Sequence, residues 1–320
     1  MLTLRLPLND PDWETRAADL LDAGKLVAVP TETVYGLAGD ATNAKAVASI
    51  FEAKGRPSHN PLIVHVADLA MAQRYAEFDR RAVKLSQAFW PGPLTLVAPL
   101  HSDTGLADAV TAGGDSLALR CPDGALRQLA ERLDRPIAAP SANRSGHVTA
   151  TTAEHVLADL GGRIAMVIDG GPTRVGVEST ILDVRGEASV TLRPGGVSSD
   201  ALEDVLENPV STMDAAQTAP AAPGMLESHY APSKPVILNM LPNDLPAGCT
   251  YLGFGGHAVE GHASLSAAGD LGEAAANLFA ALRELDGRDS AGIAIAPIPN
   301  IGLGEAINNR LKRAAAPRGD

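Results

Sequence analysis

Two cations stand close together in the segment EAKGRPSHNPLIVHV, residues 52–66. Lys54 and Arg56 are separated by one glycine and followed by a proline and several polar residues. A guanidinium offers planar donors to a phosphate and a lysine ammonium is a mobile point charge, so the pair could bind an anion. Lysine is also favoured at helix C-termini, and a solvated helix end explains the same residues. The segment alone leaves both interpretations open.

Polar side chains also follow predicted strands. The segment PTETVYGL places Thr31, Glu32 and Thr33 where a strand should end, and APSANRSG, residues 139–146, places two hydroxyls and an amide in a tight turn. Strand ends of open α/β sheets bind ligands, and such turns expose N–H groups that can bind phosphate oxygens. Threonine is common in strands, and serine and asparagine are common in turns, for structural reasons alone.

Several single residues have the same ambiguity. Arg120 lies at the end of the strand predicted in LALRCP, and Arg193 lies at the end of the strand before the turn LRPGG. Ser179 and Thr180 lie at the start of the strand predicted in VESTILDV. Most arginines at strand ends are solvated. His65 lies within the apolar run LIVHV, where a histidine is more often a core residue than a ligand.

The motifs of several other mechanisms are missing. The chain has no G-x-x-x-x-G-K-[ST] loop, no G-x-S-x-G elbow, no C-x-x-C pair and no H-E-x-x-H helix, which argues against covalent and zinc mechanisms. The segment GFGGHA, residues 253–258, matches a dinucleotide fingerprint, but the residues after it lack a helical pattern. We therefore interpret it as a glycine-rich turn, with His257 and His262 in a loop rather than on a metal.

The surrounding pattern predicts alternating helices and strands, which is typical of the α/β class. Predicted helices are 12–23, 43–54, two stretches within 68–90, and 152–160; predicted strands are 26–29, 61–66, 94–98, 116–120, 136–139, 165–169, 179–184 and 189–193. The last strands follow one another closely, so part of the sheet should be antiparallel. We expect a twisted mixed sheet with flanking helices.

The stretch 207–235 is rich in proline, alanine and small polar residues and has no sustained period, as in an interdomain linker. Beyond it, strands near 236–239, 250–254 and 291–296 and a helix over 270–286 predict a smaller α/β unit. A chain of 320 residues favours two domains. We expect domains at 1–207 and 236–320, joined by a linker at 208–235.

Charge and cysteine content narrow the function classes. The formal net charge of −12 disfavours extensive binding to nucleic acid or anionic membranes, so an anion site should be local. Cys121 and Cys249 are too few and too far apart for a disulfide framework, which suits a reducing compartment. No apolar run is long enough to predict a membrane span, so we expect a cytoplasmic protein.

Taken in order, the segments PTETVYGL, KGRPSHNPL, WPGPLT, APSANRSG, STILD and RPGG resemble the YrdC-like threonylcarbamoyl-AMP synthase family over roughly residues 10–205. The segments PGMLESHYAP and GLGEAINNRLKRAA resemble its longer, two-domain form. The resemblance implies a YrdC-like domain with a concave ligand cavity and a smaller Rossmann-like C-terminal domain. It also implies that L-threonine, bicarbonate and ATP yield threonylcarbamoyl-AMP and pyrophosphate. The adenylate would pass to a separate tRNA threonylcarbamoyl transferase, so strong direct tRNA binding is not expected.

The resemblance also implies the site residues. Lys54 and Arg56 would be catalytic, beside the reacting groups. The predicted threonine-binding residues are Thr33, His65, Arg120, which would pair with the carboxylate, and Ser179; the predicted nucleotide-binding residues are Arg56, Asn60, Ser116, Ser141, Asn143, Arg193 and Tyr230. Magnesium is expected as a cofactor held through the phosphates, without protein ligands. Relatives often carry basic residues before the His229-Tyr230 pair, where this chain has MLES, including Glu227.

The sequence is also compatible with other functions. A concave basic sheet could form a non-catalytic module that binds double-stranded RNA, although the net charge disfavours it. A carbamoyl-adenylate-forming carbamoyltransferase shares the YrdC-like domain but also has cysteine-paired zinc motifs, which this chain lacks. A nicotinamide enzyme built on Gly253 and Gly255 is a third. Tyr230 is predicted to belong to a lid over the nucleotide, or else to anchor a hinge against the second domain.

Overall fold

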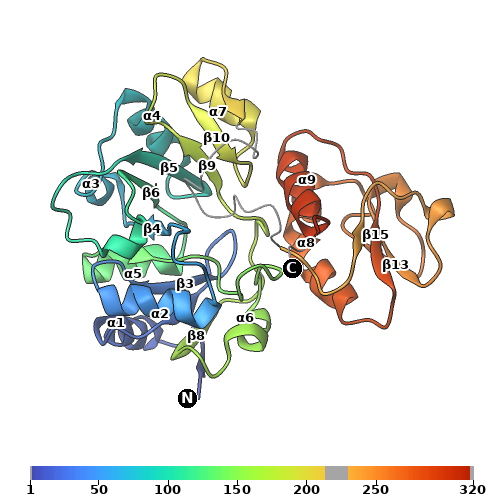
Figure 1. The fold of residues 1–320 in the computed structure, drawn as a ribbon, viewed down its shortest axis with the longest axis horizontal. Helices are drawn as coiled ribbons and strands as arrows, with labels where there is room; N and C mark the ends of the chain where they lie inside the picture. Colours follow the sequence, from blue (N-terminus) through green and yellow to red (C-terminus); the bar gives the residue numbers. More distant parts are fainter. Residues whose placement is uncertain (1, 213–229, 318–320) are drawn as a thin grey trace.

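The computed structural model describes residues 2–212 and 230–317, and the first of these ranges forms an eleven-stranded mixed sheet (Figure 1). The spatial order is β1-β8-β2-β3-β7-β4-β6-β5-β9-β10-β11. The strands are β1 (Leu4–Pro7), β2 (Val27–Val29), β3 (Gly36–Asp40), β4 (Ile63–His65), β5 (Leu94–Pro99), β6 (Ser116–Arg120), β7 (Ile137–Ala138), β8 (Met166–Asp169), β9 (Thr180–Asp183), β10 (Val190–Arg193) and β11 (Ser211–Thr212). Strand β6 pairs parallel to β4 and antiparallel to β5, so the predicted mixed sheet is confirmed.

Helices pack on this sheet and on one another. They are α1 (Trp13–Asp22), α2 (Ala44–Lys54), α3 (Leu69–Ala72), α4 (Arg80–Phe89), α5 (Ala125–Leu133), α6 (Ala153–Leu160) and α7 (Ser199–Leu206). Helix α1 packs against α5, and α4 packs against α7. One large apolar core lies between these helices and the sheet.

Helix α2 ends where the sequence predicts. The Asn43 side chain accepts hydrogen bonds from the first backbone N–H groups, and Gly55 ends the helix with a φ of 61°. A left-handed residue reverses the chain at once, and glycine adopts this conformation without a Cβ clash. The last helical residue is Lys54, which is 3% exposed, and Arg56 is 8% exposed. Neither cation is solvated, so the interpretation as a solvated helix end is wrong.

The second range forms a four-stranded parallel sheet in the order β12-β15-β13-β14. Its elements are β12 (Val236–Ile237), β13 (Cys249–Gly253), β14 (Ala263–Ser264), β15 (Gly292–Ile295), α8 (Leu271–Asp286) and α9 (Leu303–Ala314). After β13, residues 255–257 form a single 3-10 turn rather than the helix of a dinucleotide fingerprint, which argues against the nicotinamide alternative. No helix in the two described ranges is long and apolar enough to cross a membrane.

Some elements were not predicted from the sequence. These are β1, β3, α5, α7, β11, β14 and α9. Strand β11 falls within the stretch predicted as a linker, where Ser211 and Thr212 are exposed and pair with β10. A two-residue strand joined mainly through its backbone has no side-chain pattern to reveal it.

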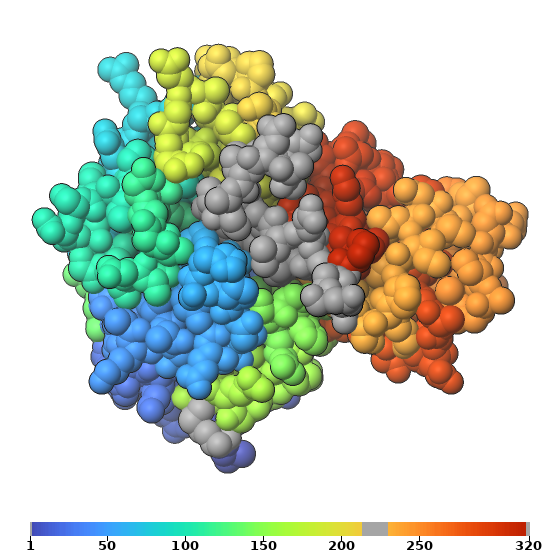
Figure 2. Space-filling view, in the orientation of Figure 1, coloured from blue at the N-terminus to red at the C-terminus, as the bar shows by residue number. Residues whose placement is uncertain are grey.

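The two domains form two lobes (Figure 2), and α8 and α9 lie on the side of the second domain that faces the first (Figure 1). The core of the second domain includes Val148 and Val177 from the first, so the interface is partly apolar. Gly176 lies so close to α8 that a Cβ would come within 2.2 Å of the Ala275 carbonyl oxygen, and its φ is 77°. The ion pairs Arg283–Asp159 and Arg310–Glu178 also join the two domains.

Candidate active site

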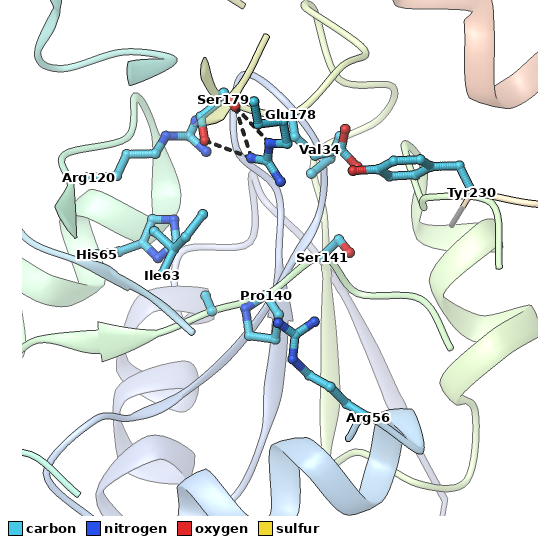
Figure 3. A pocket seen from close by; sticks show the side chains of 12 residues that line it. Val34, Arg56, Ile63, His65, Arg120, Pro140, Ser141, Glu178, Ser179 and Tyr230 are labelled. Carbon is cyan, nitrogen blue, oxygen red and sulfur yellow. Dashed lines mark hydrogen bonds between the residues drawn. The ribbon is translucent and has the colours of Figure 1, made fainter. Parts of the chain in front are cut away.

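A cavity lies where several loops and strand ends of the first domain meet (Figure 3). It is lined by Val34, Arg56, Ile63, His65, Arg120, Ala139, Pro140, Ser141, Glu178, Ser179, Arg193 and Tyr230. These residues come from the segment after β2, the turn after α2, strands β4, β6 and β10, the turn after β7 and the residues just before β9. Tyr230 reaches the cavity from the segment before β12. The order of the sheet thus gathers segments that are far apart in the sequence.

Three arginines line this cavity, Arg56, Arg120 and Arg193. Arg56 donates from Nε to the Asn60 carbonyl at 3.2 Å and from Nη2 to the Pro61 carbonyl at 2.8 Å. Burial, with a contribution from Arg193, lowers the pKa of Arg56 to about 10. Burial also lowers the pKa of Arg193 to about 10. Both groups stay charged at neutral pH, so the cavity favours an anion.

Lys54 lies beside this group of cations. Its Nζ donates to the backbone oxygens of Ser141 and Asn143, so the ammonium is held against the turn after β7. Burial, reinforced by the nearby charge of Arg56, lowers the pKa of Lys54 to about 7. The lysine charge is therefore sensitive to pH near neutrality and to a bound anion, which would favour its protonated form.

Arg120 is fixed by a buried network. Its Nη2 donates to Glu32 Oε1 at 2.7 Å and to Thr33 Oγ1 at 2.8 Å, and its Nε donates to the Gly92 carbonyl. These bonds use Nε and Nη2 and leave Nη1 for a ligand. The sequence showed Glu32 as one of three polar residues at a predicted strand end, but it gave no sign that this carboxylate orients Arg120.

Ser179 and Arg193 form a second unit. The Ser179 hydroxyl is 2.7 Å from Thr95 Oγ1, and Arg193 Nη2 donates to the Ser179 carbonyl at 2.9 Å and to its hydroxyl at 3.2 Å. All three side chains are buried. This network fixes a hydroxyl and a guanidinium on one wall of the cavity.

Three predicted site residues have buried polar atoms without a hydrogen-bond partner in the described part of the chain. They are Oδ1 and Nδ2 of Asn60, Nδ1 of His65 and Oδ1 of Asn143. Burial lowers the pKa of His65 to about 3, so its ring is neutral at physiological pH. Buried polar groups are nearly always hydrogen-bonded in native proteins, so these atoms indicate a polar ligand.

Most of the predicted site residues are brought together. Arg56, His65, Arg120, Ser141, Ser179, Arg193 and Tyr230 line the cavity, and Thr33, Lys54, Asn60 and Asn143 lie within one hydrogen bond of its lining or of one another. Ser116 does not join them. It begins β6, whereas Arg120 ends it, a separation of roughly 13 Å along the strand. Ser116 instead lines a separate cavity with His59 and Arg185.

Tyr230 contacts both domains, whereas Glu227 and His229 lie outside the described residues. The Tyr230 side chain is 1% exposed and lines the cavity, and in Figure 3 its hydroxyl points inward. Its ring also stacks on Phe279 of α8, with centroids 5.6 Å apart. Tyr230 therefore makes both expected contacts: its hydroxyl faces the cavity, as expected of a lid, and its ring packs on the second domain, as expected of a hinge anchor.

Glu178 and Arg310 were not identified from the sequence. Glu178 lines the cavity and pairs with Arg310, which belongs to the second domain. Arg310 lies in the segment GLGEAINNRLKRAA and Glu178 directly precedes STILD, but the sequence assigned neither residue a role, and they are 132 positions apart. The alternation of polar and apolar residues gives no signal for such a pair.

The described residues include no cluster of three or more histidine, cysteine or acidic side chains that could hold a metal ion. The two acidic residues at the cavity, Glu32 and Glu178, are each paired with an arginine.

Comparisons with known proteins cover both domains. A family model described as "Telomere recombination", for Sua5, YciO and YrdC proteins, matches residues 19–195. A second model, described as the threonylcarbamoyl-AMP synthase C-terminal domain, matches residues 197–316.

Full-length relatives are similar as well. A threonylcarbamoyl-AMP synthase of Bacillus subtilis is 40% identical over 99% of this chain and 96% of the relative. One from Pyrococcus abyssi is 41% identical over 96% of this chain and 95% of the relative. The crystal structure of P. abyssi Sua5 complexed with L-threonine superimposes with a TM-score of 0.88 at 37% identity, covering 98% of both chains.

Proposed function

The chain belongs to the family of two-domain threonylcarbamoyl-AMP synthases, and we propose that its cavity converts L-threonine, bicarbonate and ATP into threonylcarbamoyl-AMP and pyrophosphate. The product would serve the threonylcarbamoyladenosine modification of tRNA through a separate transferase. One observation carries the assignment of the reaction to this cavity: Arg56, Arg120 and Arg193 surround it, beside buried polar atoms that lack partners.

The reaction has two steps, formation of a carbamate and its transfer to the α-phosphate of ATP. The threonine amine attacks bicarbonate, a C–N bond forms, and water leaves to give a carbamate. A carbamate oxygen then attacks the α-phosphorus of ATP, and the bond between that phosphorus and the α,β-bridging oxygen breaks, so that pyrophosphate leaves. The carbamate is a weak nucleophile, so catalysis depends on positioning and on charge stabilisation rather than on a covalent intermediate.

The cavity residues suit these needs. Arg120, oriented by Glu32, would pair with the threonine carboxylate through its remaining donors. Lys54 and Arg56 would lie beside the carbamate and the phosphates, where negative charge moves during the reaction. His65 is neutral and can exchange hydrogen bonds with threonine without repelling the cations. The amide of Asn60 would bind the nucleotide.

Magnesium would enter with ATP as part of the substrate. Glu32 and Glu178 are each engaged with an arginine, so the phosphates rather than the protein would supply most ligands. The ion would neutralise phosphate charge when bound.

The substrate requirement tests the proposal. We expect pyrophosphate release only when ATP, magnesium, bicarbonate and threonine are all present, because the adenylate cannot form without the carbamate. A coupled pyrophosphate assay with each component omitted measures this, and mass spectrometry identifies the adenylate. Equal release without threonine or bicarbonate would contradict the proposal.

Amino-acid choice gives a second prediction. Threonine and serine should be used at least about 10-fold more efficiently than valine, because valine leaves the buried polar groups around Ser179 without a hydroxyl partner. Valine is the matched control, since it has nearly the shape of threonine. Competition assays with the three amino acids give the ratio of kcat/KM values. Equal use of valine and threonine would refute the assignment of Ser179 to threonine binding.

A further inference from the structure

Arg310 extends from the second domain to a wall of the catalytic cavity. Its side chain is fully buried, and its Nε donates to Glu178 Oε2 at 2.9 Å. Its Nη1 donates to the Pro194 carbonyl, directly after Arg193 at the end of β10. The other Glu178 oxygen accepts a hydrogen bond from Thr149 at 2.7 Å. Arg310 thus contacts a residue that lines the cavity and the backbone next to another.

The same guanidinium also contacts Tyr230. The Arg310 Cζ lies 5.4 Å from the centroid of the Tyr230 ring, and Phe279 stacks on that ring. A cation over an aromatic face stabilises the ring position, most strongly when both groups are desolvated. Two residues that line the cavity, Glu178 and Tyr230, are therefore held by one side chain of the second domain.

Charge explains why this contact matters to an anion-binding cavity. Glu178 would repel the phosphates and the carbamate if its charge were not compensated. Burial raises the pKa of Glu178, but Arg310, Arg193 and the hydrogen bond from Thr149 together outweigh this effect, and the pKa lies below its usual value. Glu178 is therefore an ionised carboxylate, and Arg310 supplies its buried counter-charge.

An arginine that only ties the two domains together would not need to contact residues that line the cavity. The chain contains such an arginine for comparison. Arg283 of α8 pairs with Asp159 at 2.8 Å and donates to the backbone oxygens of Val148 and Thr149. None of these partners lines the cavity.

We propose that Arg310 is a positioning residue of the active site, so that the C-terminal domain supplies part of the substrate-binding geometry through Glu178 and Tyr230. This inference rests on the proposed function for its link to catalysis. Its structural part, the control of ligand affinity by Arg310, can be measured without any turnover.

The experiment compares Arg310→Met with Arg283→Met in the full-length chain. Both variants remove an interdomain arginine that pairs with a carboxylate of the first domain, but only Arg310 contacts residues that line the cavity directly. We expect Arg310→Met to weaken ATP binding, measured by calorimetry, by about 10-fold or more, and to raise the KM for ATP more than it lowers kcat. Arg283→Met should leave both within 2-fold of wild type, as an order-of-magnitude limit for a contact outside the site.

A double-mutant cycle then tests whether Arg310 acts through Glu178. In a Glu178→Gln background, the effect of Arg310→Met on ATP affinity should shrink, because residues that act through one contact are not additive. If Arg310→Met fails to fold, Arg310→Lys keeps the charge but loses the planar fork, and it should show an intermediate loss of affinity.

The outcomes separate the two proposals. Inactive wild-type protein in which Arg310→Met still weakens ATP binding would overturn the proposed function and leave the positioning role intact. Active wild-type protein in which Arg310→Met behaves like Arg283→Met would overturn the positioning role. Fully additive effects of Arg310→Met and Glu178→Gln would also overturn it.

Discussion

Replacing Arg120 with methionine should raise the KM for threonine by about 30-fold or more, because a buried charge pair with the substrate carboxylate is lost. The same change leaves the Glu32 carboxylate, at 3% side-chain exposure, without its ion-pair partner, which should also destabilise the fold by about 3 to 5 kcal/mol. Steady-state kinetics and thermal unfolding measure the two effects.

A second substitution separates them. In the double variant Glu32→Gln with Arg120→Met, the uncompensated charge is gone, so much of the stability should return. The KM for threonine should remain high, because the cation is still absent. Recovery of threonine affinity together with stability would show that Arg120 acts on the fold rather than on the substrate.

Replacing Lys54 or Arg56 with alanine should lower kcat/KM by about 10- to 150-fold, because each change removes one charge-assisted contact of about 1.5 to 3 kcal/mol. Steady-state pyrophosphate release measures the loss, and circular dichroism checks that the fold is kept. Wild-type activity in either variant would remove that residue from the anion site.

The lysine also predicts a pH dependence. Because the pKa of Lys54 in the free protein is about 7, kcat/KM should fall roughly tenfold per pH unit above that value if the protonated form binds the anions. Lys54→Met should lack this limb of the profile. A wild-type profile that instead rises through pH 7 would indicate that neutral Lys54 acts as a base.

Stability gives an independent check of the same group. The folded-state pKa of Lys54, about 7, lies below its ordinary value of 10.5, so between these values the unfolded chain binds more protons. The stability of the wild type relative to Lys54→Met should therefore rise with pH across this window and level off above it. Denaturant unfolding of both proteins at several pH values measures the difference. A flat difference would mean that burial does not perturb the pKa of Lys54.

Local signals in the sequence predict much of the fold. Asn43 and Gly55 mark the ends of α2 through hydrogen bonding and backbone conformation that depend only on neighbouring residues. The spacing of Leu278, Leu282 and Leu285 likewise predicts the buried face of α8. Strands β3 and β11 were not predicted, because the first is a buried segment with two glycines and no alternating pattern and the second is exposed and two residues long.

For the candidate site too, local sequence signals predicted some features and missed others. The ordered motifs contain Lys54, Arg56 and Ser179, and the family resemblance added Arg120. Each of these residues was compatible with a solvated or structural role until its burial and partners were known. Ser116 shows the converse, since the family resemblance assigned it to nucleotide binding but the structure places it at a different cavity.

The sequence by itself determined the α/β class, the order of motifs, the local ends of helices and the set of residue types that suit anionic substrates. Only the tertiary structure decided which of these residues share one cavity, that Glu32 orients Arg120, and that Arg310 reaches Glu178 from the second domain. The physical reason is that helix caps and periodicity arise from interactions over a few residues. Burial, pKa shifts and long-range ion pairs arise from the packing of segments far apart in the sequence, 88 positions for Glu32 and Arg120 and 132 for Glu178 and Arg310, and no local pattern encodes them.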